Sequence, residues 1–225
     1  MGLKTLLSKL GIIESNKKDY SHLSEEVLEL VRALKEPVFP MFGTLLSLHR
    51  DKAFLFADDY DFAFFDRSLM SLKFIEKVES LGASLKGASV VNDELIELSF
   101  TYKKVGIDFF YLSNEAGRSV HLCPNFRTGN KVKSKKGSIK LRNFDSYFSV
   151  SYPEIELHHD ESLGLMMPTD PVSIFEQHYG NDWNIKKTRN FIDFNNYTFT
   201  QKDAQCYAGS SEKLKAMLID KGLLV

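Results

Sequence analysis

Two aspartates, Asp59 and Asp61, stand two residues apart in an aromatic run that is typical of a β-strand. Successive side chains of a strand alternate between its faces, so both carboxylates are predicted to point to one face. Tyr60, Phe62 and Phe64 would then point to the other, buried face. Two carboxylates on one face repel each other unless a cation lies between them. Oxygen ligands suit Mg²⁺ or Mn²⁺, which also hold substrate phosphates, so the pair predicts a metal site.

A second feature lies just upstream of the aspartates. Gly43 and Thr44 form a predicted turn that opens a short, leucine-rich helix over residues 44–50. Free backbone N–H groups at the start of a helix attract anions, so this turn is a candidate phosphate site. A phosphate site beside paired carboxylates indicates metal-assisted transfer of a phosphoryl-type group.

A third carboxylate, Asp108, stands among apolar residues in the strand-like run 105–112. A carboxylate that is buried without a partner costs free energy, so its setting favours a functional role. The alternative interpretation is an aspartate on an edge strand that faces water.

These residues resemble the motifs of the LicD/fukutin-type phosphotransferases, which have a DNA-polymerase-β-type nucleotidyltransferase fold. The upstream match comprises Gly43-Thr44-Leu45-Leu46, Arg50 and Asp58-Asp59-Tyr60-Asp61. The downstream match comprises Met167-Pro168 and the run from Phe175 to Trp183, which ends in a Tyr-Gly-x-x-Trp pattern. The two matches stand in the expected order. One departure is that Phe56-Ala57 precede the aspartates here, where the family commonly has Pro-Trp and a longer Asp run.

The resemblance implies an α/β (α+β) fold of the nucleotidyltransferase type, with a mixed, largely antiparallel sheet and helices packed against it. It also implies metal-dependent transfer of a phosphorylated small alcohol from a CDP-activated donor to a hydroxyl of a cell-surface glycan or glycolipid. Phosphocholine, glycerol phosphate and ribitol phosphate are the groups that the family transfers.

The resemblance further implies roles for individual residues. The implied ligands of Mg²⁺ or Mn²⁺ are Asp59, Asp61 and Asp108. Asp108 would also accept the proton of the attacking hydroxyl. Gly43 and Thr44 would contact a phosphate, and Arg50 would neutralise charge on the leaving CMP.

Three more residues are predicted to contact substrate. Trp183, the only tryptophan, is either a core anchor or an aromatic wall near the donor. Arg127 and Lys133 belong to a basic run over 127–142, in a part of the chain that carries few strand or helix signals. The run is either a solvated loop or a clamp for a donor diphosphate or an anionic acceptor. It has too few interleaved aromatic residues to indicate nucleic acid binding.

Two other functions remain open from the sequence. The same fold can transfer a nucleoside monophosphate from a nucleoside triphosphate to a protein, an RNA or a small molecule. A non-catalytic protein that binds a glycan or a partner enzyme is the other alternative, and the presence of all three candidate carboxylates argues against it.

The composition is that of a globular protein. Of 225 residues, 43% are hydrophobic and 26% are charged, and the net charge of −1 gives no general attraction to nucleic acid or anionic lipid. Two cysteines without a disulfide framework favour a reducing compartment, and no apolar run is long enough to span a bilayer. We therefore expect a cytoplasmic protein.

Two parts of the chain are distinguished. Residues 1–21 are predicted to form an N-terminal helix (3–13) and a linker, and residues 22–225 form the phosphotransferase domain. The apolar face of 3–13 suits either peripheral contact with the inner face of the membrane or packing against this domain or another copy of the chain. Within the domain, helices are expected over 22–35, 44–50, 69–81, 171–179 and 211–219, and strands over 83–91, 94–102, 105–112 and 144–157. The pairs 92–93 and 103–104 are expected hairpin turns.

Overall fold

The computed structural model describes residues 19–54, 59–127, 132–136, 139–187 and 191–224. The expected helix over 3–13 lies outside these residues. The helices are α2 (Ser24–Leu34), α3 (Phe42–Leu46), α4 (Leu72–Ser80), α5 (Pro171–Tyr179) and α6 (Ser211–Asp220). Shorter 3-10 or π segments are η1 (Ser21–Leu23), η2 (Ser47–Asp51), η3 (Arg67–Leu69) and η4 (Phe194–Asn196). None of the described helices is long and apolar enough to cross a lipid bilayer.

The strands fall into one large sheet and one separate hairpin. The sheet contains β1 (Phe39–Pro40), β2 (Asp59–Phe64), β3 (Ser84–Val91), β4 (Glu94–Tyr102), β5 (Val105–Glu115), β6 (Arg118–Pro124), β7 (Val132–Lys136), β8 (Ile139–Phe144), β9 (Tyr147–Pro153), β12 (Tyr197–Thr200) and β13 (Ala204–Ala208). The hairpin pairs β10 (Leu157–Asp160) with β11 (Leu165–Pro168).

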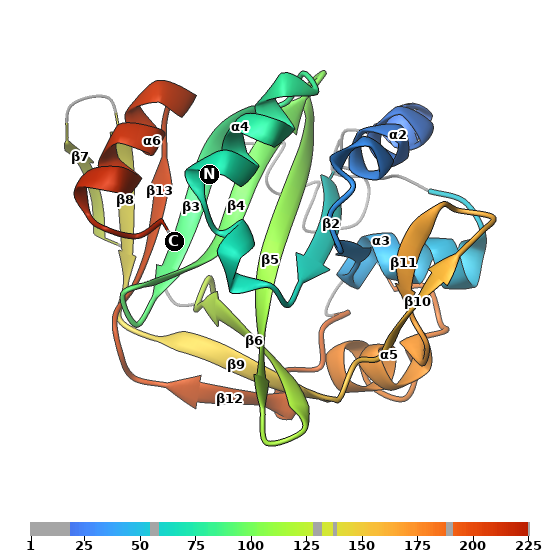
Figure 1. Ribbon diagram of the computed structural model, residues 1–225. Coiled ribbons are helices and arrows are strands. Elements are labelled where there is room, and N and C mark those ends of the chain that lie inside the picture. Colours follow the sequence, from blue (N-terminus) through green and yellow to red (C-terminus); the bar gives the residue numbers. More distant parts are fainter. Residues whose placement is uncertain (1–18, 55–58, 128–131, 137–138, 188–190, 225) are drawn as a thin grey trace, which may run out of the picture.

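The large sheet is mixed and largely antiparallel, as the sequence predicts. Its main order is β12-β9-β6-β5-β4-β3-β13-β8-β7, and β2 joins it as a parallel neighbour of β5. Strand β5 serves two parts of the sheet, because residues 106–111 pair with β2 and residues 112–115 pair with β6. The sheet is therefore curled, and β9 and β12 lie across the bottom of the view in Figure 1.

The two faces of the sheet bury different cores. Helices α2, α4 and α6 cover one face, and Figure 1 shows α4 and α6 over the strands. The core beneath them contains Tyr60, Phe62, Phe64 and Phe109, each fully buried. On the other face α3 packs against β2 and α5 packs against β9, around Leu45 and other residues of a second core. The side chains of β2 on the second face therefore lie beside α3.

Local signals explain most helix ends and tight turns. Helix α5 begins after Asp170, whose carboxylate accepts the Ser173 N–H at 3.2 Å, and it ends at Gly180 with a φ of +86°. The hairpin turns are confirmed, since both residues at 92–93 and both at 103–104 have positive φ, as a type I′ turn requires. Helix α4 starts at Leu72, later than the predicted residue 69, because Ser71 is its N-cap.

Two regions for which the sequence predicts no strand contain strands in the structure. Residues 113–143 contain the C-terminal end of β5 and the strands β6, β7 and β8, and residues 184–205 contain β12 and the start of β13. Strand β6 also pairs with β9, and β12 and β13 pair with partners far along the chain, which local sequence does not show. Strand β13, for example, pairs with β3 and with β8.

Candidate active site

The predicted carboxylates come together where β2, β5 and β4 lie side by side. Asp61 is the register partner of Asp108 across the parallel β2–β5 pair, and Ser99 of β4 is opposite Asp108 on the other side. Tyr60 and Phe62 are buried under the helices, so the expected alternation of this strand is confirmed. The carboxylates therefore lie on the face of the sheet that carries α3 and α5.

Gly43 and Thr44, in the first turn of helix α3, hold Asp61 in place. The Gly43 N–H donates to the Asp61 carboxylate, and the Thr44 hydroxyl accepts the Asp61 N–H at 2.7 Å. Met41 N–H donates to the Asp61 carbonyl oxygen at 3.0 Å. Thr44 is only 2% exposed, so its hydroxyl serves Asp61 in this structure. A phosphate contact by Gly43 and Thr44 stays a prediction, and it would require these groups to exchange partners.

An aromatic cluster holds the turn itself. Phe42 has a φ of 46°, an uncommon conformation for a bulky residue that the surroundings must stabilise. Its ring lies against His178 at a centroid distance of 4.6 Å and against His121 at 5.1 Å. His178 Nδ1 is hydrogen-bonded to the Tyr197 hydroxyl at 2.5 Å. Burial lowers the pKa of His178 to about 3 and that of His121 to about 4, so both rings are neutral at pH 7.

A fourth carboxylate, Glu97 of β4, belongs to the cluster and was missed by the sequence prediction. Its two oxygens accept from the Ser89 hydroxyl at 2.5 Å and from the Ser99 hydroxyl at 3.2 Å. Its charge raises the pKa of both Asp61 and Asp108. Glu97 stands between two apolar residues in an expected strand, which is the same signal that identified Asp108.

The cluster is electrostatically unfavourable without a cation. Burial raises the pKa of Asp61 well above its usual value, and the charges of Asp59, Asp108 and Glu97 add to the rise. Burial, followed by the charge of Glu97, also raises the pKa of Asp108 well above its usual value. Among the residues that the structure describes, no lysine or arginine forms an ion pair with Asp61, Asp108 or Glu97. All three side chains nevertheless keep some contact with solvent.

The donor set fits a hard cation. Four carboxylates supply only oxygen ligands, and the positive charge of Mg²⁺ or Mn²⁺ would remove their mutual repulsion. Within the described part of the chain, no three acidic, histidine or cysteine side chains converge on a ready-made coordination site. One or two carboxylates with substrate phosphate oxygens and water form the usual ligand set of Mg²⁺, so this geometry is compatible with it.

The variant Glu97→Gln is expected to stabilise the protein at high pH. Burial raises the pKa of Glu97 above 4.5, its value in the unfolded chain, so the folded state binds this proton more tightly. Folding stability due to Glu97 therefore falls as the pH rises from 4.5 through the folded pKa. Thermal unfolding between pH 5 and about pH 9 should show a melting temperature that falls less steeply with pH in the variant. The control is Glu94→Gln, at an exposed position on the same strand. Equal pH dependence of stability in wild type and Glu97→Gln would contradict the raised pKa of Glu97.

Arg50 and Trp183 lie at one side of the carboxylates. The Arg50 guanidinium forms two hydrogen bonds with the Asp51 carboxylate, at 3.1 and 2.9 Å, and a third with the Trp183 carbonyl oxygen at 3.3 Å. The Trp183 ring packs on Phe175 at 5.0 Å, as expected of a core anchor. Burial raises the pKa of Tyr179, the charge of Asp61 adds to the rise and that of Arg50 opposes it. Tyr179 therefore lies close enough to Asp61 and Arg50 for both charges to affect its pKa. The Asp51 carboxylate balances part of the charge of Arg50.

Arg127 and Lys133 are not brought to the carboxylates. The Arg127 guanidinium lies 4.1 Å from the centroid of the Phe194 ring, in the connection that follows β6. Lys133 occupies β7 at the far edge of the sheet, opposite Arg142 of β8. Substrate contacts by these two residues stay predictions, and Lys133 is separated from Asp108 by the width of several strands.

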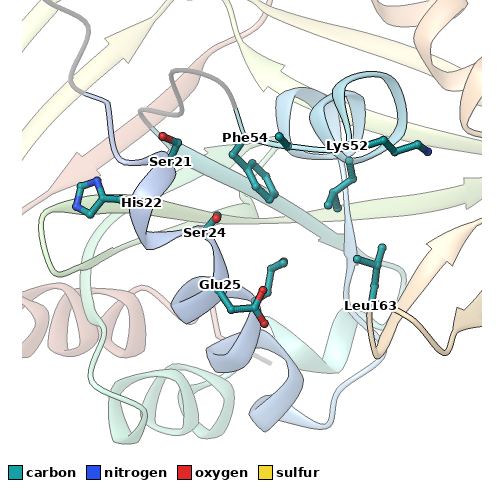
Figure 2. Close-up of a pocket in the computed structure, with 10 residues that line it drawn as sticks. Ser21, His22, Ser24, Glu25, Lys52, Phe54 and Leu163 are labelled. Atoms are coloured by element: carbon teal, nitrogen blue, oxygen red, sulfur yellow. The ribbon is translucent and has the colours of Figure 1, made fainter.

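A cavity of about 430 Å³ lies apart from the predicted site residues. Figure 2 shows it between the start of α2, the residues that follow η2 and Leu163 near the β10–β11 turn. It is lined by Ser21, His22, Ser24, Glu25, Leu28, Leu48, Lys52, Ala53, Phe54 and Leu163. Phe54 packs on Tyr60 at 5.0 Å, on the face opposite to the carboxylates. The cavity and the carboxylate cluster are therefore separate features.

Neither a comparison with models of known protein families nor a comparison with curated proteins finds a match for this chain. The function must therefore be argued from the carboxylate cluster and the residues that position it.

Proposed function

We propose that the chain is a metal-dependent phosphotransferase of the nucleotidyltransferase type, similar to LicD/fukutin-type enzymes. It would transfer a phosphorylated small alcohol, such as phosphocholine, glycerol phosphate or ribitol phosphate, from a CDP-activated donor to a hydroxyl of a glycan or glycolipid. One observation carries the proposal. Asp61, Asp108 and Glu97 are packed together with raised pKa values and without ion pairs to the described lysines and arginines. Such an arrangement is costly unless it binds a cation.

The proposal assigns a role to each side chain of the carboxylate cluster. Asp59, Asp61 and Asp108 would hold Mg²⁺ or Mn²⁺, with Glu97 behind them. When bound, the cation supplies positive charge to the donor diphosphate and to the phosphorus under attack. The turn at Gly43 fixes the orientation of Asp61 through its N–H. Because every one of these groups is on a strand or on a turn packed against one, little reorganisation is needed during the reaction.

The chemistry is a displacement at phosphorus. The acceptor hydroxyl oxygen bonds to the phosphorus that carries the alcohol, and Asp108 takes the hydroxyl proton. The bond between this phosphorus and the bridging oxygen of the diphosphate breaks, and CMP leaves with the bridging oxygen. Arg50, whose charge acts on Tyr179 as that of Asp61 does, would offset charge on the leaving group once the donor competes with Asp51 for its guanidinium.

A thermal-shift screen tests the proposal. CDP-choline, CDP-glycerol, CDP-ribitol, CTP, ATP and UTP are each added with and without Mg²⁺ or Mn²⁺. A ligand that binds only the folded state raises the free energy of unfolding, by about 2.7 kcal/mol when its concentration is 100 times Kd. The melting temperature rises with it. We expect a metal-dependent shift with one CDP-alcohol that disappears in Asp59→Asn. A shift with a nucleoside triphosphate alone would instead favour nucleotidyl transfer, and no shift with any compound would contradict the proposed donor.

A further inference from the structure

One buried carboxylate beside the candidate active site is shared by two cations. Asp51 is the last residue of η2, and its side chain is only 7% exposed. The Arg50 guanidinium donates to its two oxygens at 3.1 and 2.9 Å, and the Lys186 ammonium lies 3.0 Å from one of them. We call Arg50, Asp51 and Lys186 the Arg50 triad. The Arg50 triad has one positive charge in excess, which an anionic ligand would balance.

One continuous segment places the Arg50 triad beside the carboxylate cluster. Gly43, whose N–H donates to Asp61, belongs to α3, and α3 continues directly into η2, which ends at Asp51. Burial raises the pKa of Tyr179, the charge of Asp61 adds to the rise and that of Arg50 opposes it. Arg50 and Asp61 therefore both lie near this phenol, so the Arg50 triad is a neighbour of the carboxylate cluster.

Asp51 competes with any phosphate that uses Arg50. The Arg50 hydrogen bonds lower the pKa of Asp51, burial opposes this fall and the hydrogen bond from Lys186 adds to it, so Asp51 is ionised at neutral pH. Asp51 holds Nε and one terminal nitrogen of the guanidinium, and the Trp183 carbonyl oxygen accepts from the other at 3.3 Å. A phosphate that takes two parallel hydrogen bonds from Arg50 must displace one of these partners. Its observed affinity is therefore reduced by the fraction of Arg50 that is already occupied.

Lys186 controls how easily Arg50 leaves Asp51. A buried carboxylate that loses its only cation is strongly destabilising. Because Lys186 Nζ lies 3.0 Å from the Asp51 carboxylate, Asp51 keeps one partner when Arg50 turns to a ligand. The Lys186 side chain is 62% exposed, so its replacement leaves the core unchanged. Loss of Lys186 would make Asp51 hold Arg50 more strongly.

The proposed reaction gives such a competitor a purpose. In a CDP-alcohol each phosphorus group carries one negative charge. When CMP leaves, the bridging oxygen keeps the electron pair of the broken bond, and the CMP phosphate becomes a dianion at neutral pH. A dianion is attracted to a guanidinium more strongly than a monoanion is. A carboxylate that returns to Arg50 weakens the hold on the departing CMP.

We propose that Asp51 is an intramolecular competitor that weakens the binding of nucleotide phosphate to Arg50, and that Lys186 sets how strongly Asp51 competes. The assignment of this phosphate to the leaving CMP rests on the proposed function, whereas the competition at Arg50 does not. Asp51 and Lys186 are positioning residues in this account, because they act on the ligand through Arg50.

The test follows CMP binding to the full chain with Mg²⁺ at constant concentration. Trp183 is the only tryptophan and its carbonyl oxygen accepts from Arg50, so its indole N–H gives one NMR signal near the Arg50 triad. Asp51→Asn removes the competing charge and should lower the Kd of CMP by about fivefold or more. Lys186→Gln keeps Asp51 and should raise the Kd by about threefold or more. An unchanged or raised Kd in Asp51→Asn overturns the proposal.

A double-mutant cycle separates competition from direct contact with the ligand. If Lys186 acts only through Asp51, Lys186→Gln should have no effect on CMP binding in the Asp51→Asn background. An equal effect of Lys186→Gln in both backgrounds would mean that Lys186 attracts the ligand itself, which overturns its role. The controls are Asp182→Asn and Lys187→Gln, which remove a neighbouring ion pair and should change the Kd by less than about twofold.

Inorganic phosphate separates failure of this inference from failure of the proposed function. Tighter binding of inorganic phosphate to Asp51→Asn than to wild type, without any binding of CMP, supports the Arg50 triad and counts against the CDP-activated donor alone. Binding of neither ligand to wild type or Asp51→Asn overturns the inference. Thermal unfolding shows whether each variant is folded. If Asp51→Asn does not fold, equal Kd values for wild type and Lys186→Gln still overturn the proposal.

Discussion

Asp61→Asn is expected to lower metal-dependent turnover by about 10³-fold or more, because it removes the charge of a proposed metal ligand in the carboxylate cluster. The same change should make the metal-free protein more stable at neutral and high pH. Burial raises the pKa of Asp61 above its unfolded value of 3.8, so its ionisation destabilises the fold as the pH rises through the folded pKa. The asparagine oxygen can still accept the Gly43 N–H, so the turn should be retained.

The matched control is Asp93→Asn, the same substitution at an exposed position of the β3–β4 turn. Asparagine tolerates the positive φ of residue 93 at least as well as aspartate, so neither stability nor turnover should change. Release of CMP from the CDP-alcohol measures turnover, and thermal unfolding at several pH values measures stability. Loss of the folded state in Asp61→Asn, or similar turnover in both variants, would contradict the role of Asp61.

His178→Ala is expected to lower the free energy of unfolding by about 3 kcal/mol, and the melting temperature by roughly 6–12 °C. The ring is 7% exposed and packs between Phe42 at 4.6 Å and Tyr179 at 4.4 Å. Its Nδ1 is also hydrogen-bonded to the hydroxyl of Tyr197 at 2.5 Å and lies 3.3 Å from that of Tyr152. The substitution therefore creates a cavity and removes the Nδ1 partner of the two tyrosine hydroxyls.

Two comparison variants make the His178 result specific. His178→Asn places an amide near the position of Nδ1, so it should lose less stability than His178→Ala. His159→Ala removes an imidazole whose side chain is 50% exposed and should change stability by less than about 0.5 kcal/mol. A loss below about 1 kcal/mol in His178→Ala would mean that the aromatic cluster does not hold the turn at Phe42 and Gly43.

The carboxylate strand was predictable because its signal is local. Alternation with period two fixes the face of Asp59 and Asp61 once Tyr60 and Phe62 are recognised as buried. Asp108 was predictable as well, because a carboxylate that is buried in an apolar strand without a partner costs free energy and so indicates a function. The two hairpin turns that flank β4 were equally predictable from the sequence, because each is a single pair of residues between two strand-like runs.

The rest of the site depends on contacts that no local pattern shows. The sequence predicted that Gly43 and Thr44 would bind phosphate, whereas here they hold Asp61, which lies on a different element. Glu97 carries the same signal as Asp108, but its importance appears only when β4 is placed beside β5. The setting of Ser89, which donates to Glu97, requires β13 beside β3, and this pairing joins residues more than a hundred positions apart.

The most direct test of the central claim is a titration of the protein with Mn²⁺, in which electron paramagnetic resonance measures the free ion. With a saturating CDP-alcohol, we predict that wild type and Asp93→Asn remove Mn²⁺ from solution with a defined stoichiometry, and that Asp61→Asn does not. Binding should also strengthen as the pH rises, because the ion competes with the protons held by the raised pKa values of Asp61 and Asp108. Equal Mn²⁺ binding by wild type and Asp61→Asn, or no binding by either, would contradict a metal site at the carboxylate cluster.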